Sequence, residues 1–238
     1  SLHDALPIYW SLMDAGEYTY NGYRPTEYTA WERERFGWMD IETLSEASNI
    51  ELAPLSEGGK AYRIVNDKDQ SGHEYYILEN VQKKGWNKSA FGSGMMVTHV
   101  DYDDYYFSLG GCKVNSTAGH PRMTIMPADG MFVSEYYIGE TIKESSDPTV
   151  KEINAPLVEK YGGQEFTSAL YKAEAAGDLY PGTANTTSLT DTSSPVKAWT
   201  YTGETMDKPI TDIAMNPETG IVSFKFMGGK TDGIRNIS

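Results

Sequence analysis

The residues best suited to chemistry lie in the middle of the chain, where histidines, carboxylates and an amide surround an apolar run. His99 and Asp101 are two positions apart, so both side chains would face the same side of a β-strand. Carboxylate and amide oxygens beyond a strand end are frequent calcium ligands, and imidazole adds affinity for softer metals. The same composition is common in turns, where such groups bond to one another. We therefore expect either a structural metal site or a polar hydrogen-bond network, formed by His99, Asp101, Asp103, Asn115, His120 and Asp129, with Asp104 beside them.

Other reactive residue types lack the partners that their chemistry requires. Glu79 ends an apolar run, but no second acid stands in a recognisable relation to it, as a glycosidase would need. Ser93 lies in Gly-Ser-Gly and lacks the Gly-x-Ser-x-Gly frame of a nucleophile elbow. Cys112 is the only cysteine, so it forms no intrachain disulfide, and no histidine partner is evident by spacing. None of these residues indicates an enzyme mechanism by itself.

The histidines of this chain do not form a zinc-peptidase motif. In His-Glu-x-x-His, two imidazoles share one helix face and the Glu acts on the zinc-bound water. His73 is followed by Glu74, but Ile77 stands where the second histidine would be needed. The residues around it are β-branched and aromatic, which predicts a strand instead of a helix.

The elements that would position these residues are one short helix and a series of strands. Thr29 and Glu32 have the spacing of a capping box, which predicts a helix over 30–36 with Gly37 ending it. Residues 139–161 are polar, with a short helix expected over 155–161, and 182–195 has the composition of an exposed loop. Alternation and turn residues predict strands at 50–52, 61–65, 74–78, 95–100, 122–126, 209–215 and 221–226, with hairpins joining the second to the third and the last two.

Five segments, in order along the chain, resemble the immune-inhibitor-A-like metallopeptidases, peptidase family M-six, which belong to the metzincin class. The first, 9–38, contains Tyr-Trp-Ser-Leu-Met-Asp-Ala-Gly and is similar to the segment that follows the zinc helix in that family. The resemblance covers most of the chain from Tyr9 onward, thinly between Met131 and Gly177. The other segments are Glu74–Gln82, Gly94–Asp101, His120–Gly130 and, more weakly, Leu179–Gly182 with Pro209–Ile213.

The resemblance implies a role for Met13 and a missing zinc site. Met13 would be the methionine of the Met turn, which lies beneath the metal and supports its ligands, in an apolar core with Trp10 and Leu12. Without the zinc helix, Met13 would become ordinary core or exposed apolar surface. The family motif His-Glu-x-x-His is absent, so the resemblance implies the C-terminal part of a secreted bacterial zinc endopeptidase that is inactive as it stands. Zinc, and calcium as a second candidate, would be cofactors of the intact enzyme, with a protein or peptide as substrate.

These observations predict the domain organisation and the fold class. We interpret residues 1–8 as foreign sequence, the alternative being a divergent natural N-terminus. Residues 9–45 would end a metzincin-like catalytic domain, and 46–227 would form a β-rich region with a polar insertion at about 131–178. Residues 228–238 would be a tail or linker. The expected fold is α+β and predominantly β, with a short helix after the Met turn followed by an antiparallel, sandwich-like β-rich region.

Charge and composition restrict the partners. Lys and Arg number 20 against 34 Asp and Glu, so the net charge is 20 − 34 = −14. Such an acidic surface argues against nucleic acid and anionic membranes, and no apolar run approaches the roughly 20 residues of a membrane span. We expect an extracellular monomer. The 17 Tyr and 5 Trp allow a function of another class, a non-catalytic β-sandwich that binds protein or glycan. A degenerate family member that kept the scaffold for interaction and lost the metal is a further alternative.

Overall fold

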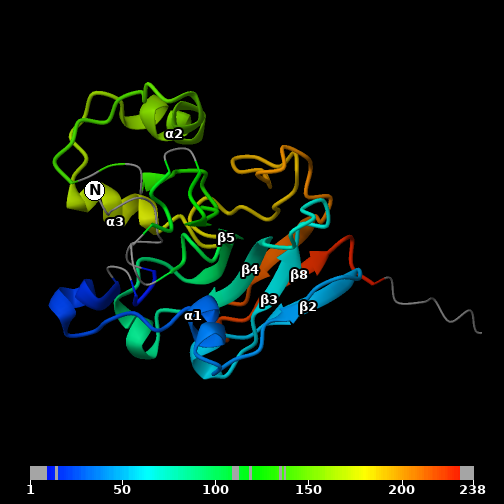
Figure 1. Cartoon of the computed structure of the whole chain (residues 1–238). Helices are drawn as coiled ribbons and strands as arrows, with labels where there is room; N and C mark the ends of the chain where they lie inside the picture. Colours follow the sequence, from blue (N-terminus) through cyan, green and yellow to red (C-terminus); the bar gives the residue numbers. More distant parts are fainter. Residues whose placement is uncertain are drawn as a thin grey trace, which may run out of the picture.

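The computed structural model describes residues 10–13, 16–108, 113–117, 120–133, 136 and 138–230, and they form two β-sheets with a few helices (Figure 1). The α+β, predominantly β class expected from the sequence is confirmed. All neighbouring strands pair antiparallel except β1 and β3, which are parallel. Sheet A has the order β1 (Glu42–Thr43), β3 (Tyr62–Val65), β4 (Glu74–Val81), β5 (Gly94–Asp101) and β6 (Met123–Ile125), and sheet B has the order β2 (Ser48–Leu52), β8 (Val222–Phe226) and β7 (Ile210–Met215).

Helix α1 (Ala30–Arg35) forms where the capping box predicted it. The Thr29 hydroxyl accepts the Glu32 N–H at 3.3 Å, and the Glu32 carboxylate accepts the Thr29 N–H at 2.6 Å. Phe36 is the C-cap, and Gly37 follows it with φ +72°, the left-handed conformation that glycine adopts without a steric penalty. Local residue pairs therefore determine both ends of this helix.

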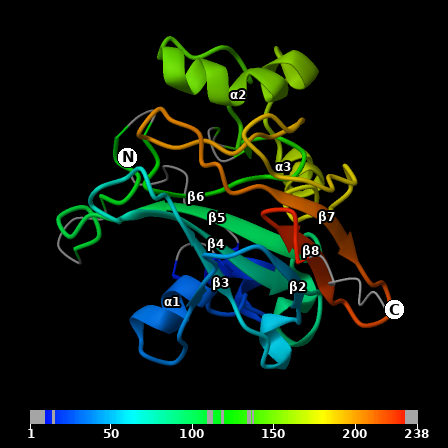
Figure 2. The same ribbon diagram turned by 90° about the vertical axis from the view of Figure 1, so that its right-hand side faces the viewer.

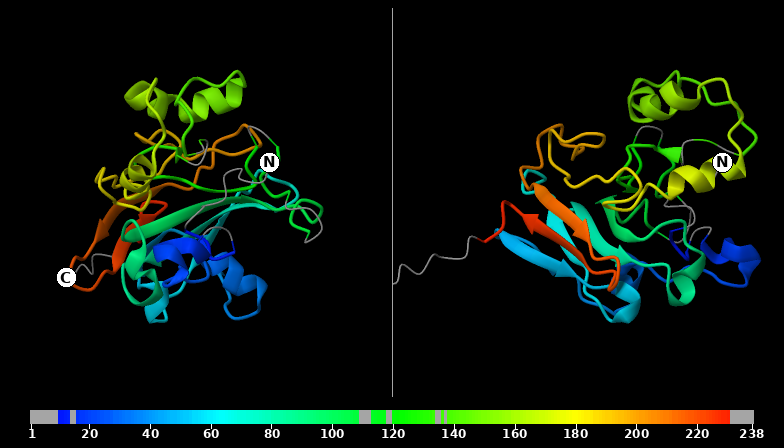
Figure 3. Two further views of the ribbon diagram at one scale, coloured as in Figure 1. Left: turned by 90° about the vertical axis from the view of Figure 1, so that its left-hand side faces the viewer. Right: turned by 180° about the vertical axis from the view of Figure 1, so that it is seen from behind.

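Sheet A is covered on both faces, which explains why its central strands are apolar throughout. Every residue of β4 and nearly every residue of β5 is buried. Tyr75 and Ile77 pack with Ala30 of α1 on one face. Tyr76 and Leu78 pack on the other face with residues of sheet B. Figures 2 and 3 show α1 on the first side, and α2 (Pro148–Tyr161) and α3 (Ser168–Ala175) on the opposite side.

The strongest hairpin prediction is confirmed by β7 and β8. The Gly220 N–H donates to the Asn216 carbonyl at 2.8 Å, and Gly220 has φ +74°. A β-bulge in β7, with Asp212 at φ +54°, shifts the register between the two strands. The hairpin of β3 and β4 is likewise confirmed, with Tyr62 opposite Leu78.

Residues 138–175 carry more helix than the sequence predicted. Helix α2 begins at Pro148 instead of 155, because the Asp147 carboxylate accepts the Val150 N–H at 3.0 Å and Pro148 suits the first helical position. Helix α3 was not expected, although the Thr167 hydroxyl caps it by accepting the Leu170 N–H. The remaining helical segments are the short 3-10 turns η1 (Gly16–Gly22), η2 (Leu55–Glu57) and η3 (Gly85–Ser89).

Candidate functional site

Buried polar side chains form two clusters, one on each face of sheet A. The first is the turn that begins at Trp10. The Gly16 N–H donates to the Ser11 carbonyl at 2.9 Å, and a Cβ on Gly16 would lie 2.3 Å from that oxygen. Only glycine fits this approach of the backbone to itself. The backbone at Gly16 therefore comes back to within hydrogen-bond distance of Ser11.

Glu32 holds this turn against α1. Its buried carboxylate accepts the Ser11 hydroxyl at 2.6 Å and the Met13 N–H at 3.0 Å, in addition to the Thr29 N–H of the capping box. Three donors on one carboxylate leave little freedom in the backbone around Ser11 and Met13. Trp10 is fixed separately, by donating its indole N–H to the buried Asp178 carboxylate at 2.8 Å.

The Met13 side chain points away from this support. It is 64% exposed, whereas Trp10 is buried. The expectation that Met13 shares an apolar core with Trp10 is therefore wrong in this chain. Glu32 holds the Met13 backbone N–H, while the cluster around Trp10 is formed by other residues, among them Val81 and Leu179. The exposed apolar surface that the sequence left as an alternative is what the structure has.

Glu79 lies beneath α1 and close to Glu32. Its carboxyl is fully buried and accepts the Ala30 N–H at 2.8 Å. Burial raises the pKa of Glu79 to about 8, the Ala30 N–H works against this rise, and the charge of Glu32 adds to it. Glu79 is therefore a neutral acid at pH 7. Glu79 supports the helix start, and the Glu32 carboxylate near it is already used by three hydrogen-bond donors.

The second polar cluster lies on the opposite face of sheet A and contains His99. This imidazole is fully buried, and its Nε2 lies 2.8 Å from Glu74 Oε1 on the neighbouring strand. Glu74 also accepts the Tyr201 N–H at 2.6 Å and an Asn66 side-chain N–H at 2.7 Å. Burial tends to raise the pKa of Glu74, but the hydrogen bonds from these three groups hold it below its ordinary value.

Asp101 lies in the half-exposed part of this cluster and contacts His120 and Arg122 there. Its carboxylate lies 2.6 Å from His120 Nε2 and 2.7 Å from Arg122 Nη1. The Arg122 guanidinium also lies over the Tyr106 ring, at 4.1 Å from its centroid. The His120 ring stacks on Tyr201 at 3.7 Å. Asp101 and His120 are thus brought together as the sequence suggested, by hydrogen bonding to each other.

Three other candidate ligands lie apart from this pair and have their own partners. Asp103 accepts the backbone N–H groups of Tyr105 and Tyr106 in a turn. Asn115 exchanges two hydrogen bonds with the backbone of Met123. Asp129 accepts the Met131 N–H at 2.9 Å, and burial raises its pKa to about 6. Among the described residues, these three side chains therefore bond separately to the backbone and do not join Asp101 and His120 in one network.

The described part of the chain places no three His, Cys, Asp or Glu side chains where they could share a metal ion. The donor set that zinc would need is therefore not offered by these residues, and no catalytic step through zinc can be derived from them. His73 is exposed at the start of β4, and Glu74 is used by His99, so neither belongs to a zinc motif.

The sequence analysis did not predict that Glu74 and Tyr201 belong to the polar cluster around His99. The predicted hairpin joined the strand of Glu74 to 61–65, and the pairing with the strand of His99, which brings the two side chains to one face, was not predicted. Tyr201 lies about a hundred residues further along the chain in a loop, and no local pattern marks it.

Comparison with protein families, with curated proteins and with solved structures found no match to this chain. None of the helices in the described residues combines the length and apolar character of a membrane span.

Proposed function

We propose that this chain is the C-terminal part of a secreted bacterial zinc endopeptidase of the immune-inhibitor-A-like kind. In the intact enzyme, a preceding segment with His-Glu-x-x-His would hold zinc, and a protein or peptide would be the substrate. Calcium is a second candidate cofactor.

The observation that carries this proposal is the geometry of the turn at Met13. Its backbone is fixed by Glu32, while its thioether is 64% exposed on the surface. A rigid turn that presents an apolar side chain outward suits a support on which another element rests. The family order of the sequence segments agrees with this role.

The first test is the source DNA upstream of the codon for Tyr9. The proposal expects a continuous reading frame that encodes His-Glu-x-x-His shortly before Trp10. The full product should cleave casein, lose that activity with a zinc chelator and regain it with zinc. The chain as it stands should not cleave casein with or without zinc, because it has no such motif. A start codon directly before Ser1 would contradict the proposal.

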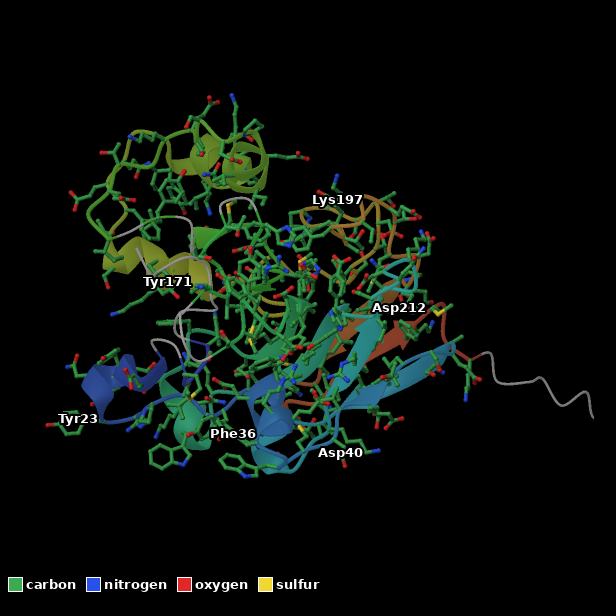
Figure 4. All side chains as sticks on the ribbon, viewed as in Figure 1. Tyr23, Phe36, Asp40, Tyr171, Lys197 and Asp212 are labelled. Carbon is green, nitrogen blue, oxygen red and sulfur yellow. The ribbon has the colours of Figure 1, made fainter. Side chains whose placement is uncertain are left out.

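A second candidate function is binding of protein or glycan through exposed aromatic side chains. Phe36 and Trp38 are 47% and 64% exposed, and their rings pack at 4.8 Å beside Tyr28. Figure 4 shows Phe36 and Tyr23 on the outer surface at the α1 side. Titration with soluble glycans and with unfolded casein, followed by loss of binding in Trp38→Ala, would favour this function.

A further inference from the structure

Residues 199–201, which we call the strap, cover His99 on the face of sheet A that also carries Tyr76. Tyr76 of β4 holds the strap at one end, because its hydroxyl accepts the Trp199 N–H at 2.8 Å and donates to the Trp199 carbonyl. Tyr201 holds it at the other end, through its N–H to Glu74 and its hydroxyl to the Pro121 carbonyl at 2.6 Å. The strap is therefore attached to the sheet by these polar contacts and by the packing of Trp199 against the apolar core.

His99 lies at the centre of these contacts. Its ring meets the Trp199 ring edge-on at 4.2 Å and the Tyr76 ring at 5.1 Å, and it stacks on Tyr201 at 5.1 Å. His120 stacks on Tyr201 as well, so the tyrosine ring has an imidazole at close range on each side. A change in the charge of His99 would therefore act directly on both aromatic residues of the strap.

The two nitrogens of His99 are in different situations. Nε2 faces the Glu74 carboxylate, which only accepts hydrogen bonds, so Nε2 carries the hydrogen of the neutral ring. No described residue gives Nδ1 a hydrogen-bond partner, although the side chain is fully buried. A second proton would go to Nδ1 and create a buried N–H donor without an acceptor.

We propose that the strap is a proton-operated latch, closed over sheet A while His99 is neutral and released when Nδ1 takes up a proton. The charged and titratable groups facing His99 are Glu74 and Tyr76 on β4, Asp101 on its own strand, and Tyr201 on the strap. His120 and Arg122 face it from the segment before β6.

The combined effect of burial and of these groups on the pKa of His99 determines whether the strap opens at low or at high pH. Burial lowers the pKa of His99 below its ordinary value, although Glu74 and Asp101 oppose this and His120 adds to it. Because the folded pKa is lowered, the closed strap is fully stable above the ordinary histidine pKa of about 6.5 and loses stability as the pH falls below it. Attraction between a protonated imidazole and the Tyr201 ring works against release. This inference does not depend on the peptidase proposal.

Hydrogen–deuterium exchange of the strap, analysed by mass spectrometry, tests the latch. Exchange in a peptide spanning 196–206 is measured between pH 7.5 and about pH 5.5, more than one unit above the ordinary glutamate pKa of about 4.3, and is divided by the rate of the same free peptide. We expect the opening equilibrium to rise as the pH falls below about 6.5, by at most about tenfold per pH unit. The β8 peptide Val222–Phe226 should keep its protection throughout.

Two variants distinguish the effect of His99 on strap exchange from that of His120. In His99→Gln, an amide N–H can still reach Glu74 but nothing titrates, so the pH dependence of strap exchange should vanish. In His120→Gln the pH dependence should remain, even if the overall level shifts. Should His99→Gln fail to fold, the ring resonances of His99 in the unaltered protein must titrate together with strap exchange. The latch is overturned if strap exchange shows no pH dependence, if His99→Gln keeps it, if β8 opens in parallel, or if His99 titrates while the strap stays closed.

Discussion

At the scale of single residues, buried carboxyl groups hold segments of the backbone in position. Glu32 collects backbone and hydroxyl donors and so fixes a turn to a helix. Glu79, beneath it, has one donor and remains protonated at neutral pH. Burial keeps the proton on Glu79, and this allows its carboxyl to lie close to that of Glu32.

Glu79→Gln should therefore change how stability depends on pH. A carboxyl whose folded pKa is raised stabilises the fold most at low pH and loses that contribution as the pH rises through its folded pKa, here about 8. Between its ordinary pKa of about 4.3 and about 8, this group alone lowers the free energy of unfolding by about 1.4 kcal/mol per pH unit. Urea denaturation at several pH values should show that slope reduced in Glu79→Gln and unchanged in the exposed control Glu46→Gln. An unaltered slope in Glu79→Gln would assign the proton to another group.

At the scale of elements, the two sheets are joined through Asn80 as well as through their apolar faces. The Asn80 amide on β4 donates to the Leu52 carbonyl of β2 at 2.6 Å and to the Gly220 carbonyl in the turn before β8 at 2.8 Å. Its own oxygen accepts the Gln82 amide. One fully buried side chain thus satisfies two backbone carbonyls at the end of sheet B where Leu52 pairs with Val222.

Asn80→Ala should destabilise the protein by about 3 kcal/mol, because it leaves two buried carbonyls without donors and removes packing volume. The measurement is the free energy of unfolding from urea denaturation. Asn49→Ala is the matched control, since Asn49 is exposed and donates only to the Lys230 carbonyl at 3.2 Å. An effect of Asn80→Ala no larger than that of the control would show that apolar contacts alone hold the sheets together.

The sequence predicted elements well where the decisive contacts are local. Thr29 and Glu32 are three residues apart, and Asn216 and Gly220 are four apart, so the capping box and the hairpin turn could both be recognised. It failed where a distant segment supplies the partner. Residues 182–195 looked like an exposed loop, yet Leu189 is buried in the main apolar core, and its backbone pairs with Ile210.

The candidate site shows the same limit. The pairing of Asp101 with His120 could be anticipated as a polar network. The burial of His99 under Tyr201, and the anchoring of Met13 by Glu32, could not, because both depend on how separate elements pack. Resemblance to a family indicated a role for Met13 but not that its side chain would be exposed.

At the scale of the whole molecule, Trp10 ties the start of the described chain to a segment far along it. Its indole donates to Asp178, and its ring packs edge-on against Phe91 at a centroid distance of 5.9 Å. Asp178 is itself fully buried, and burial raises its pKa well above the ordinary value, with the nearby charge of Asp129 adding to the rise. Through this contact, the N-terminal turn stabilises the region that leads out of α3.

Trp10→Ala should lower the free energy of unfolding by about 3–5 kcal/mol, the usual effect of emptying a buried aromatic position. Trp10→Phe, which keeps most of the packing but removes the indole N–H, should cost about 1–3 kcal/mol. The matched control is Trp38→Ala at an exposed tryptophan, where we expect a change within about 0.5 kcal/mol. Equal effects of Trp10→Ala and Trp38→Ala in urea denaturation would show that the contact with Asp178 adds little.

The order of strands in sheet B has a consequence for how the protein is made. Strand β2 lies between residues 48 and 52, but its only strand partner in the described chain, β8, ends at Phe226. During synthesis on a ribosome, β2 must wait for about 170 further residues before it can pair. Throughout that time its backbone edge and the apolar side chains of Ile50 and Leu52 remain available to other chains. A chaperone that shields nascent apolar segments should therefore raise the yield of folded protein, and products cut short before Val222 should aggregate.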